Sequence, residues 1–283
     1  MSTKPRAAPQ PAPEEDETAR AQRSVQSVEV GGRLLLALAD ELAPMGLKDL
    51  AAKAGLPAAR AHPYLVSFGK LGLVEQDPAS QRYALGPAAL QIGLSSLHQL
   101  DPIKAATPVV EALAASLGQM VVLAVWANFG PTVVRMVEGG QPLHVNMRAG
   151  TVMSIFGTAT GRAFVAALPP AQLERALTGP LGEPATSEGW KAADRSVEIG
   201  KIVEEWRAHG VTRAVGRPIP GVNAFSAPVF DHEGQAALVI TAMGHEDTFP
   251  SQWKSSPALA VRRAAEEVST RLGYRPPPAS RTA

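Results

Sequence analysis

Residues 56–77 read LPAARAHPYLVSFGKLGLVEQD, and this stretch decides how the first part of the chain folds. Leu65, Phe68 and Leu71 recur at the spacing of one helical face, which predicts a short helix with these three side chains turned inward. Gly72 is placed to end that helix, and the residues after it read as a short strand. The stretch therefore predicts a helix that leads through a tight turn into a strand.

The residues on either side complete a unit of helices and one hairpin. Residues 32–42 (GRLLLALADEL) and 47–55 (LKDLAAKAG) carry apolar residues at helical spacing. Residues 72–77 and 81–86 read as two short strands around a turn of Pro, Ala and Ser. This order is typical of a winged helix-turn-helix, which we assign to residues 24–86. Its second packed helix projects so that it can enter a DNA major groove about 12 Å wide.

Pro63 leaves two structures open for the third helix. Proline inside a helix removes one backbone hydrogen bond and clashes with the carbonyl four residues back, at a cost of roughly 3 kcal/mol. The helix either kinks, with its first turn formed by residues 57–62, or starts late, with Pro63 at the first helical position, where the missing N–H costs nothing. Arg60 lies on a loop in the second case.

A leucine-striped helix separates this unit from the rest of the chain. Leu90, Leu94 and Leu97 share one helical face, and a lone apolar stripe outside a core predicts packing on a partner helix. We therefore assign residues 87–101 as a linker and dimerisation helix. Residues 102–274 contain β-branched runs arranged in hairpins, with PLHVNM as one predicted strand and helices gathered around them. That pattern is typical of an α+β domain.

Composition narrows the chemistry and the location. The chain has 283 residues, no cysteine and a formal net charge of +1, which excludes disulfides, cysteine-bound zinc and thiol catalysis. No apolar run reaches the roughly 20 residues of a membrane helix. Residues 1–23 are rich in Pro, Ala and charge and lack the apolar core of a signal peptide. We expect them to be a disordered tail, residues 275–283 to be a flexible tail, and the protein to be cytoplasmic without membrane contact.

The charge of the first unit does not by itself indicate a nucleic-acid partner. Residues 24–86 contain six Lys or Arg and six Asp or Glu. The positions of the charges therefore matter more than their sum. A local basic face is enough to release counterions from DNA, even when the whole unit is neutral.

Several motifs together resemble the IclR family of transcription regulators. The first part carries LKDLAAKAGLPAARAH, LVSFGKLGLVEQD and RYALGPAALQIG, and the second carries GTATGRAFVA and GVNAFSAPVFDHEGQAALVITAMG. The resemblance extends from about residue 24 to residue 274. It implies a cytoplasmic DNA-binding repressor or activator that forms homodimers or homotetramers. It also implies that the α+β domain is a GAF-like effector-binding domain for a small metabolite, frequently an organic or aromatic acid.

The candidate DNA contacts lie on or near the outer side of the third helix, on the helix before it and on the wing. Arg60 can bind guanine or hold a phosphate, while lysines suit phosphates. The predicted DNA-binding residues are Lys48, Lys53, Ala58, Arg60, Ala61, His62, Tyr64 and Arg82. Each charged residue could instead be an ordinary solvated charge. Pro63 departs from the family pattern, in which a long polar or basic residue is usual at that position.

The candidate effector site begins at a predicted helix start in VMSIFGTATGRAF. The free N–H groups and partial positive charge of a helix start suit a carboxylate, so we expect an organic acid near residues 157–161. The resemblance adds two residues just before that turn and others from the motifs GVNAFSAPVFD and ITAMG. The full predicted set is Met153, Ile155, Gly157, Ala159, Thr160, Val222, Ala224, Thr241 and Met243. Because polar lining is sparse, a larger and partly apolar acid such as an aromatic acid fits better than a two-carbon acid. Met153, Ile155 and Val222 could instead simply fill a core.

Other chemistry finds little support in the sequence. His232-Glu233 and His245-Glu246-Asp247 lack a third spaced ligand, so no metal is expected. GTATGRAF lacks the Lys-Ser/Thr ending of a phosphate loop, there is no HExxH or GxSxG motif, and no cofactor is predicted. The leading hypothesis is a ligand-responsive regulator that binds double-stranded DNA. The alternatives are a sensor that has lost DNA binding and acts through protein partners, and an enzyme, for which no catalytic constellation is found.

Overall fold

The protein divides into two compact units at the boundary between Gln99 and Leu100. The structure, a computed structural model, describes residues 25–41, 43–143, 145–178 and 192–276. The predicted tail of residues 1–23 lies outside them, as does most of the predicted tail at the other end. No helix in these ranges is both long enough and apolar enough to cross a membrane.

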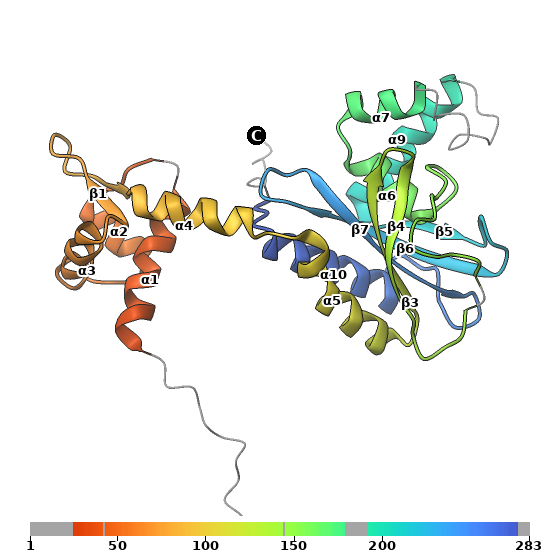
Figure 1. The fold of residues 1–283 in the computed structure, drawn as a ribbon, viewed down its shortest axis with the longest axis horizontal. Coiled ribbons are helices and arrows are strands. Elements are labelled where there is room, and N and C mark those ends of the chain that lie inside the picture. Colours follow the sequence, from red (N-terminus) through yellow and green to blue (C-terminus); the bar gives the residue numbers. More distant parts are fainter. Residues whose placement is uncertain (1–24, 42, 144, 179–191, 277–283) are drawn as a thin grey trace, which may run out of the picture. The chain divides into compact units, whose positions relative to one another are not determined.

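The first unit is a winged helix-turn-helix, as predicted (Figure 1). Two of its helices, α2 and α3, end just before a glycine with positive φ that lets the chain turn, Gly55 (φ +68°) and Gly72 (φ +70°). The elements are α1 (Gln26–Ala39), α2 (Leu47–Lys53), α3 (Ala58–Lys70) and the antiparallel wing strands β1 (Val74–Gln76) and β2 (Tyr83–Leu85). Helix α1 thus begins before the predicted residue 32.

One apolar core holds the three helices together. Leu34 of α1, Leu50 of α2 and Leu65 of α3 are fully buried and belong to the same cluster. Backbone hydrogen bonds between Met45 and Tyr83, 2.9 and 2.8 Å long, tie the wing to the segment between α1 and α2. Leu71 was predicted to face this core but is 65% exposed, because it is the C-terminal cap of α3 rather than part of its inner face.

Helix α3 runs without a break across Pro63. The late start at Pro63 is therefore wrong, and Arg60 lies on the helix rather than on a loop. Pro63 has no N–H, so the carbonyl of Ala59 has no i+4 partner in the helix. The Pro63 ring is exposed, and its own carbonyl accepts a hydrogen bond from Ser67 Oγ at 3.0 Å.

Helix α4 (Pro87–His98) follows the wing and has no buried residue. The predicted stripe is exposed to solvent, with Leu90 63%, Leu94 46% and Leu97 40% exposed. An apolar stripe of this kind is unusual on a surface helix unless another surface covers it.

The second unit is built on a five-stranded antiparallel sheet with the strand order β4-β3-β7-β6-β5 (Figure 1). The strands are β3 (Met120–Ala127), β4 (Gly130–Val137), β5 (Thr212–Val215), β6 (Val222–Phe230) and β7 (Ala236–His245). Together with the helices on its two faces, this sheet confirms the predicted α+β class.

Helices α5 (Pro102–Leu117) and α10 (Ser256–Arg271) cover one face of the sheet (Figure 1). Alternate residues of β7 divide between the faces, as pleating requires. Leu238, Ile240 and Ala242 point into the core under α5 and α10, whereas Val239 and Met243 belong to clusters on the opposite side.

The opposite face is only partly covered by helices. Helix α6 (Ala159–Ala167) packs on the sheet through Ala163 and Phe164. Helices α7 (Pro170–Thr178) and α9 (Ala192–His209) pack on α6. The side chain of Arg162 bridges Glu198 and Glu205 of α9 at 2.7 Å each, with all three side chains only 16–17% exposed, which fixes α9 to α6.

The predicted strand PLHVNM is not found among the described residues of that segment. Two successive backbone hydrogen bonds, from Val145 N–H to Leu143 O (3.1 Å) and from Met147 N–H to Val145 O (3.0 Å), fold the chain tightly there instead. Apolar side chains of the segment still pack against the uncovered part of the sheet. The apolar pattern was therefore a sign of burial and not of strand pairing.

Gly161 in the first turn of α6 is a position where any side chain should disrupt the fold. The carbonyl oxygens of Ser154 and Ile155 lie so close that a Cβ cannot fit. We expect Gly161→Ala to lower the free energy of unfolding by about 1–3 kcal/mol, measured by denaturant titration. Gly200→Ala is the matched control, because Gly200 is also helical and has open space around it. It should be neutral or stabilising by up to about 1 kcal/mol. Equal stability of the two variants would contradict this view of α6.

Candidate functional site

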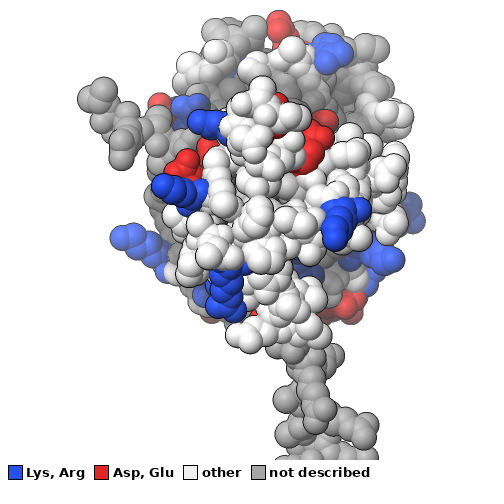
Figure 2. All heavy atoms as spheres, turned by 90° about the vertical axis from the view of Figure 1, so that its left-hand side faces the viewer, with Lys and Arg blue, Asp and Glu red and all other residues white. Residues whose placement is uncertain are grey.

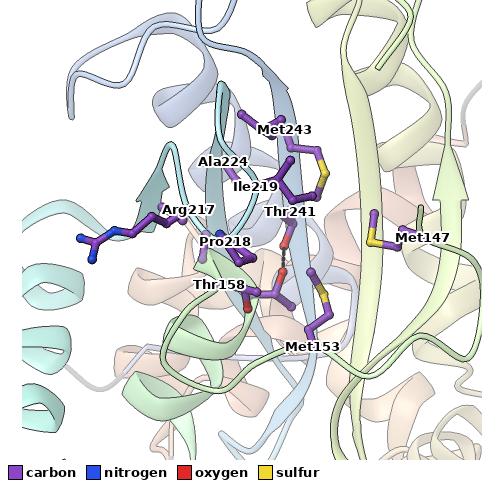
Figure 3. A pocket seen from close by; sticks show the side chains of 13 residues that line it. Met147, Met153, Thr158, Arg217, Pro218, Ile219, Ala224, Thr241 and Met243 are labelled. Atoms are coloured by element: carbon purple, nitrogen blue, oxygen red, sulfur yellow. Dashed lines mark hydrogen bonds between the residues drawn. The ribbon is translucent and has the colours of Figure 1, made fainter. Parts of the chain in front are cut away.

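A pocket lies on the sheet face that helices leave partly uncovered, beside the start of α6 (Figure 3). Its volume is about 420 Å³, counted out to its open mouth. Most of the lining is apolar, and the polar side chains are three threonines and one arginine. Such a hollow can hold a small molecule that is mainly apolar and has one polar end.

Small residues at matched register positions create the hollow. Met120 of β3 pairs with Met243 of β7, which pairs with Ala224 of β6, which pairs with Ala214 of β5. Directly paired residues project to the same face of an antiparallel sheet. Along this row, two long side chains are followed by two alanines. The short alanine side chains leave space above the sheet, and this space is part of the pocket.

The neighbouring row of the sheet carries hydroxyl groups. Thr241 of β7 pairs with Ser226 of β6, which pairs with Thr212 of β5. The Thr241 hydroxyl lies 2.7 Å from the Ser226 hydroxyl. It also lies 2.7 Å from the Thr160 hydroxyl in α6, and Figure 3 draws this bond as a dashed line from Thr241. Thr212 Oγ1 donates to the carbonyl of Ala159 at 2.8 Å. All these side chains are buried. Because each hydroxyl has a hydrogen-bond partner, burying it carries no desolvation penalty for an unpaired polar group. The bonds attach the first turn of α6 to the sheet.

The anchored turn leaves backbone donors at the pocket. Thr158 is the N-terminal cap of α6, and its side chain accepts from the N–H of Gly161 at 2.9 Å. The N–H groups of Ala159 and Thr160 have no acceptor in the part of the chain that the structure describes. Both residues line the pocket. A helix start with free N–H groups attracts a negatively charged group.

Seven of the nine residues predicted for the effector site line this pocket: Met153, Ala159, Thr160, Val222, Ala224, Thr241 and Met243. Ile155 does not line the pocket, so that prediction was wrong: its side chain is 1% exposed in a core with Phe156 and Ile202.

Gly157 lies instead in a neighbouring, more polar cavity that also contains Arg162 and Arg213. The Arg213 guanidinium stacks 3.9 Å from the ring centre of Trp253 and donates to Ser251 O.

Six further lining residues lie outside the predicted set of nine, although Thr158 falls within the predicted stretch 157–161: Met147, Thr158, Ala214, Arg217, Pro218 and Ile219. A signal existed for three of them, because GRPIPG between two strands has the composition of a turn beside the strand ends. Arg217 is exposed at the rim and has no ion-pair partner among the described residues. Figure 3 shows its guanidinium pointing away from the methionines of the pocket.

On α3, the exposed side carries only part of the predicted DNA-binding set. Arg60 and His62 are exposed, while Ala58 and Tyr64 are half-buried against the core of the unit. Ala61 is 0% exposed, so its prediction as a DNA contact is corrected. It occupies the inner face, one residue from Arg60, because successive helical residues point about 100° apart.

The remaining cations are partly engaged within the protein. Lys48 is exposed, but Lys53 forms a 2.9 Å ion pair with Glu41. Arg82 of the wing donates to the carbonyl of Pro44 at 2.9 Å. Figure 2, which looks onto the side of the structure where α3 is drawn, shows Lys and Arg side chains standing apart rather than as one continuous basic patch. An exposed ion pair is weak, so Lys53 can exchange Glu41 for another anion.

The wing turn is held by an acidic residue. The Ser80 hydroxyl, followed by the backbone N–H groups of Ala79 and Ser80, lowers the pKa of Asp77 below its ordinary value. These hydrogen bonds close the turn between β1 and β2 in the absence of a glycine. Asp77 therefore has a structural role in the wing.

No group of three or more His, Asp or Glu side chains lies close enough to hold a metal ion in the described ranges. In particular, His245 is paired with Asp247 at 3.2 Å on the surface.

Comparison with known proteins connects both units to one family. The model "IclR helix-turn-helix domain" matches residues 27–78, and "Bacterial transcriptional regulator IclR C-terminal" matches residues 94–270. The glycerol operon regulatory protein of Streptomyces griseus is 29% identical, covering 89% of this chain and 98% of that protein. The transcriptional regulator KipR of Bacillus subtilis is 26% identical, covering 81% and 90%.

A solved structure gives the same result for the fold. The crystal structure of Pseudomonas aeruginosa HmgR is 33% identical, covers 88% of this chain and 99% of its own, and superimposes with a TM-score of 0.79. The relatives are transcriptional regulators and not enzymes. This chain therefore belongs to the IclR family of bacterial transcriptional regulators, with an N-terminal helix-turn-helix DNA-binding domain and a C-terminal effector domain.

Proposed function

We propose that this regulator binds operator DNA as a homodimer or homotetramer and responds to a small organic acid with an apolar, aromatic body. The observation that carries the proposal is the pocket beside α6. It joins two backbone N–H groups that have no acceptor in the described residues to an otherwise apolar hollow. A DNA-binding regulator acts where the DNA is, and we include a cytoplasmic location in the same proposal.

The carboxylate of the effector would sit at the start of α6. The N–H groups of Ala159 and Thr160 supply charge-assisted hydrogen bonds, and the Thr160 hydroxyl, at the end of the chain from Ser226 through Thr241, can reorient to donate. The remaining body of the acid would lie over Ala224 and Ala214, where the floor is deep. Arg217 at the rim adds an unpaired positive charge that favours entry of an anion.

DNA reading would rest on Arg60 and His62, which α3 presents on its exposed side. Lys48, Lys53 and Arg82 would hold phosphates. The alternative of a sensor that acts only through protein partners drew support from Pro63. That support is weakened because α3 is continuous across the proline and Arg60 stays on the helix.

Dimerisation would use α4. Its exposed leucines, Leu90, Leu94 and Leu97, form a stripe that two copies can bury against each other. A dimer is also what the reading of two half-sites requires. A ligand that favours one arrangement of two such copies would change the spacing of their winged helices and hence DNA affinity.

Replacement of Pro63 tests the reading helix. We expect Pro63→Arg to strengthen binding to unrelated duplex DNA at fixed low salt, because it adds a cation to the exposed side of α3 and restores a backbone donor to Ala59 O. The slope of log affinity against log salt should steepen by about 0.9 for one new phosphate contact. Pro63→Ala restores the donor without the charge and should leave the slope unchanged. An unchanged or weaker affinity for Pro63→Arg in a fluorescence-anisotropy titration would count against the proposed reading face.

Filling the pocket tests the effector site and the function together. We expect Ala224→Leu to fill the floor, keep the gel shift on DNA upstream of the gene, and abolish the effect of an added aromatic acid such as phenylacetate. In the unaltered protein the acid should raise the melting temperature, because it binds the folded state, and should change the gel shift.

Ala236→Leu is the control, since Ala236 is a partly exposed alanine of β7 away from the pocket. It should respond to the acid as the unaltered protein does. An undiminished response of Ala224→Leu would place the effector elsewhere, and no gel shift at low salt with or without acid would favour the protein-partner alternative.

A further inference from the structure

The sulfur atoms of the protein are concentrated at the pocket. The chain has seven methionines and no cysteine. Five of the seven belong to one apolar cluster on the uncovered sheet face: Met120, Met136, Met147, Met153 and Met243. Three of these five, Met147, Met153 and Met243, line the pocket itself, whereas none of its lining residues is aromatic. Recognition of a ring in this pocket would therefore come from thioethers.

The three lining methionines reach the pocket from separate parts of the chain. Met243 is fixed in β7, opposite Met120, and both are only 5% exposed. Met153 is held to β4 by a 2.8 Å hydrogen bond from its N–H to Pro131 O. Met147 lies in the tightly folded segment after β4. In Figure 3 the side chains of all three are drawn around the pocket that contains Thr241. A planar ligand whose polar end is at α6 would have sulfur near its ring from more than one side.

Thioethers distinguish an aromatic ring from a saturated ring of similar size. A polarisable sulfur about 5 Å from a ring gains energy from the π-system, often at the ring edge. A saturated ring offers only ordinary apolar contact. Leucine matches methionine in volume but lacks the sulfur, so exchange of the two isolates this difference.

We propose that Met147, Met153 and Met243 are specificity-determining residues that make the pocket prefer an aromatic acid over its saturated counterpart. This inference rests on the proposed function, because it assumes that an organic acid occupies the pocket. It goes further by assigning the selection of the ring to three named side chains.

The test compares phenylacetate with cyclohexylacetate, which have the same carboxylate and the same carbon count. Isothermal titration of the full-length protein should show tighter binding of phenylacetate. Met153→Leu and Met147→Leu should each weaken phenylacetate binding by about two- to tenfold and leave cyclohexylacetate binding within twofold. Met136→Leu is the matched control, because Met136 packs in the same cluster without lining the pocket. It should change neither affinity.

The outcomes separate the two proposals. If both acids bind equally well to the unaltered protein, or if Met153→Leu and Met147→Leu weaken both acids to the same extent, the methionine inference is wrong while the acid site stands. If neither acid binds at millimolar concentration and Ala224→Leu has no effect, the proposed acid site fails and this inference fails with it.

Discussion

The attachment of the first turn of α6 to the sheet is the constraint on which the rest of the effector domain depends. Three buried hydroxyls and one carbonyl make that attachment, at Thr160, Thr241, Thr212 and Ala159. Gly161 permits it, because the backbone of residues 154 and 155 lies where a side chain would be. The bonds use the side of the turn that faces the sheet. The N–H groups of Ala159 and Thr160 at the helix start have no acceptor in the described residues.

The same constraint links the pocket to the rest of the domain. Helix α6 carries Arg162, whose two ion pairs hold α9 against it. Met243 and Ala214, which belong to the row under the pocket, lie on β7 and β5, the strands that hold the start of α6. A ligand that touches both the helix start and the alanines therefore contacts two elements that these hydroxyl bonds connect. This is the kind of contact through which binding can favour one arrangement of a domain over another.

Much of the architecture could be predicted from residue spacing. Glycines that follow apolar helical patterns predicted the ends of α2 and α3, and runs of β-branched residues predicted β3 and β4. Pocket positions on regular strands, such as Thr241 and Met243, could also be predicted, because the motif fixes their register. In irregular segments, periodicity does not predict which side chains face the pocket. Met153 lines the pocket, but Ile155, two residues later, is buried in a core. The neighbours Arg60 and Ala61 show the same limit on α3, because the rotation of a helix about its axis is set by tertiary packing.

We propose that the N–H groups at the start of α6 bind the carboxylate of an acid. Amide resonances of Ala159 and Thr160 in a deuterated, ¹⁵N-labelled sample can be followed during titration with phenylacetate. Both amide protons should move downfield on addition of the acid and stay in place with its uncharged amide, phenylacetamide. If these two resonances do not move while amides elsewhere in the protein do, the carboxylate does not bind at α6.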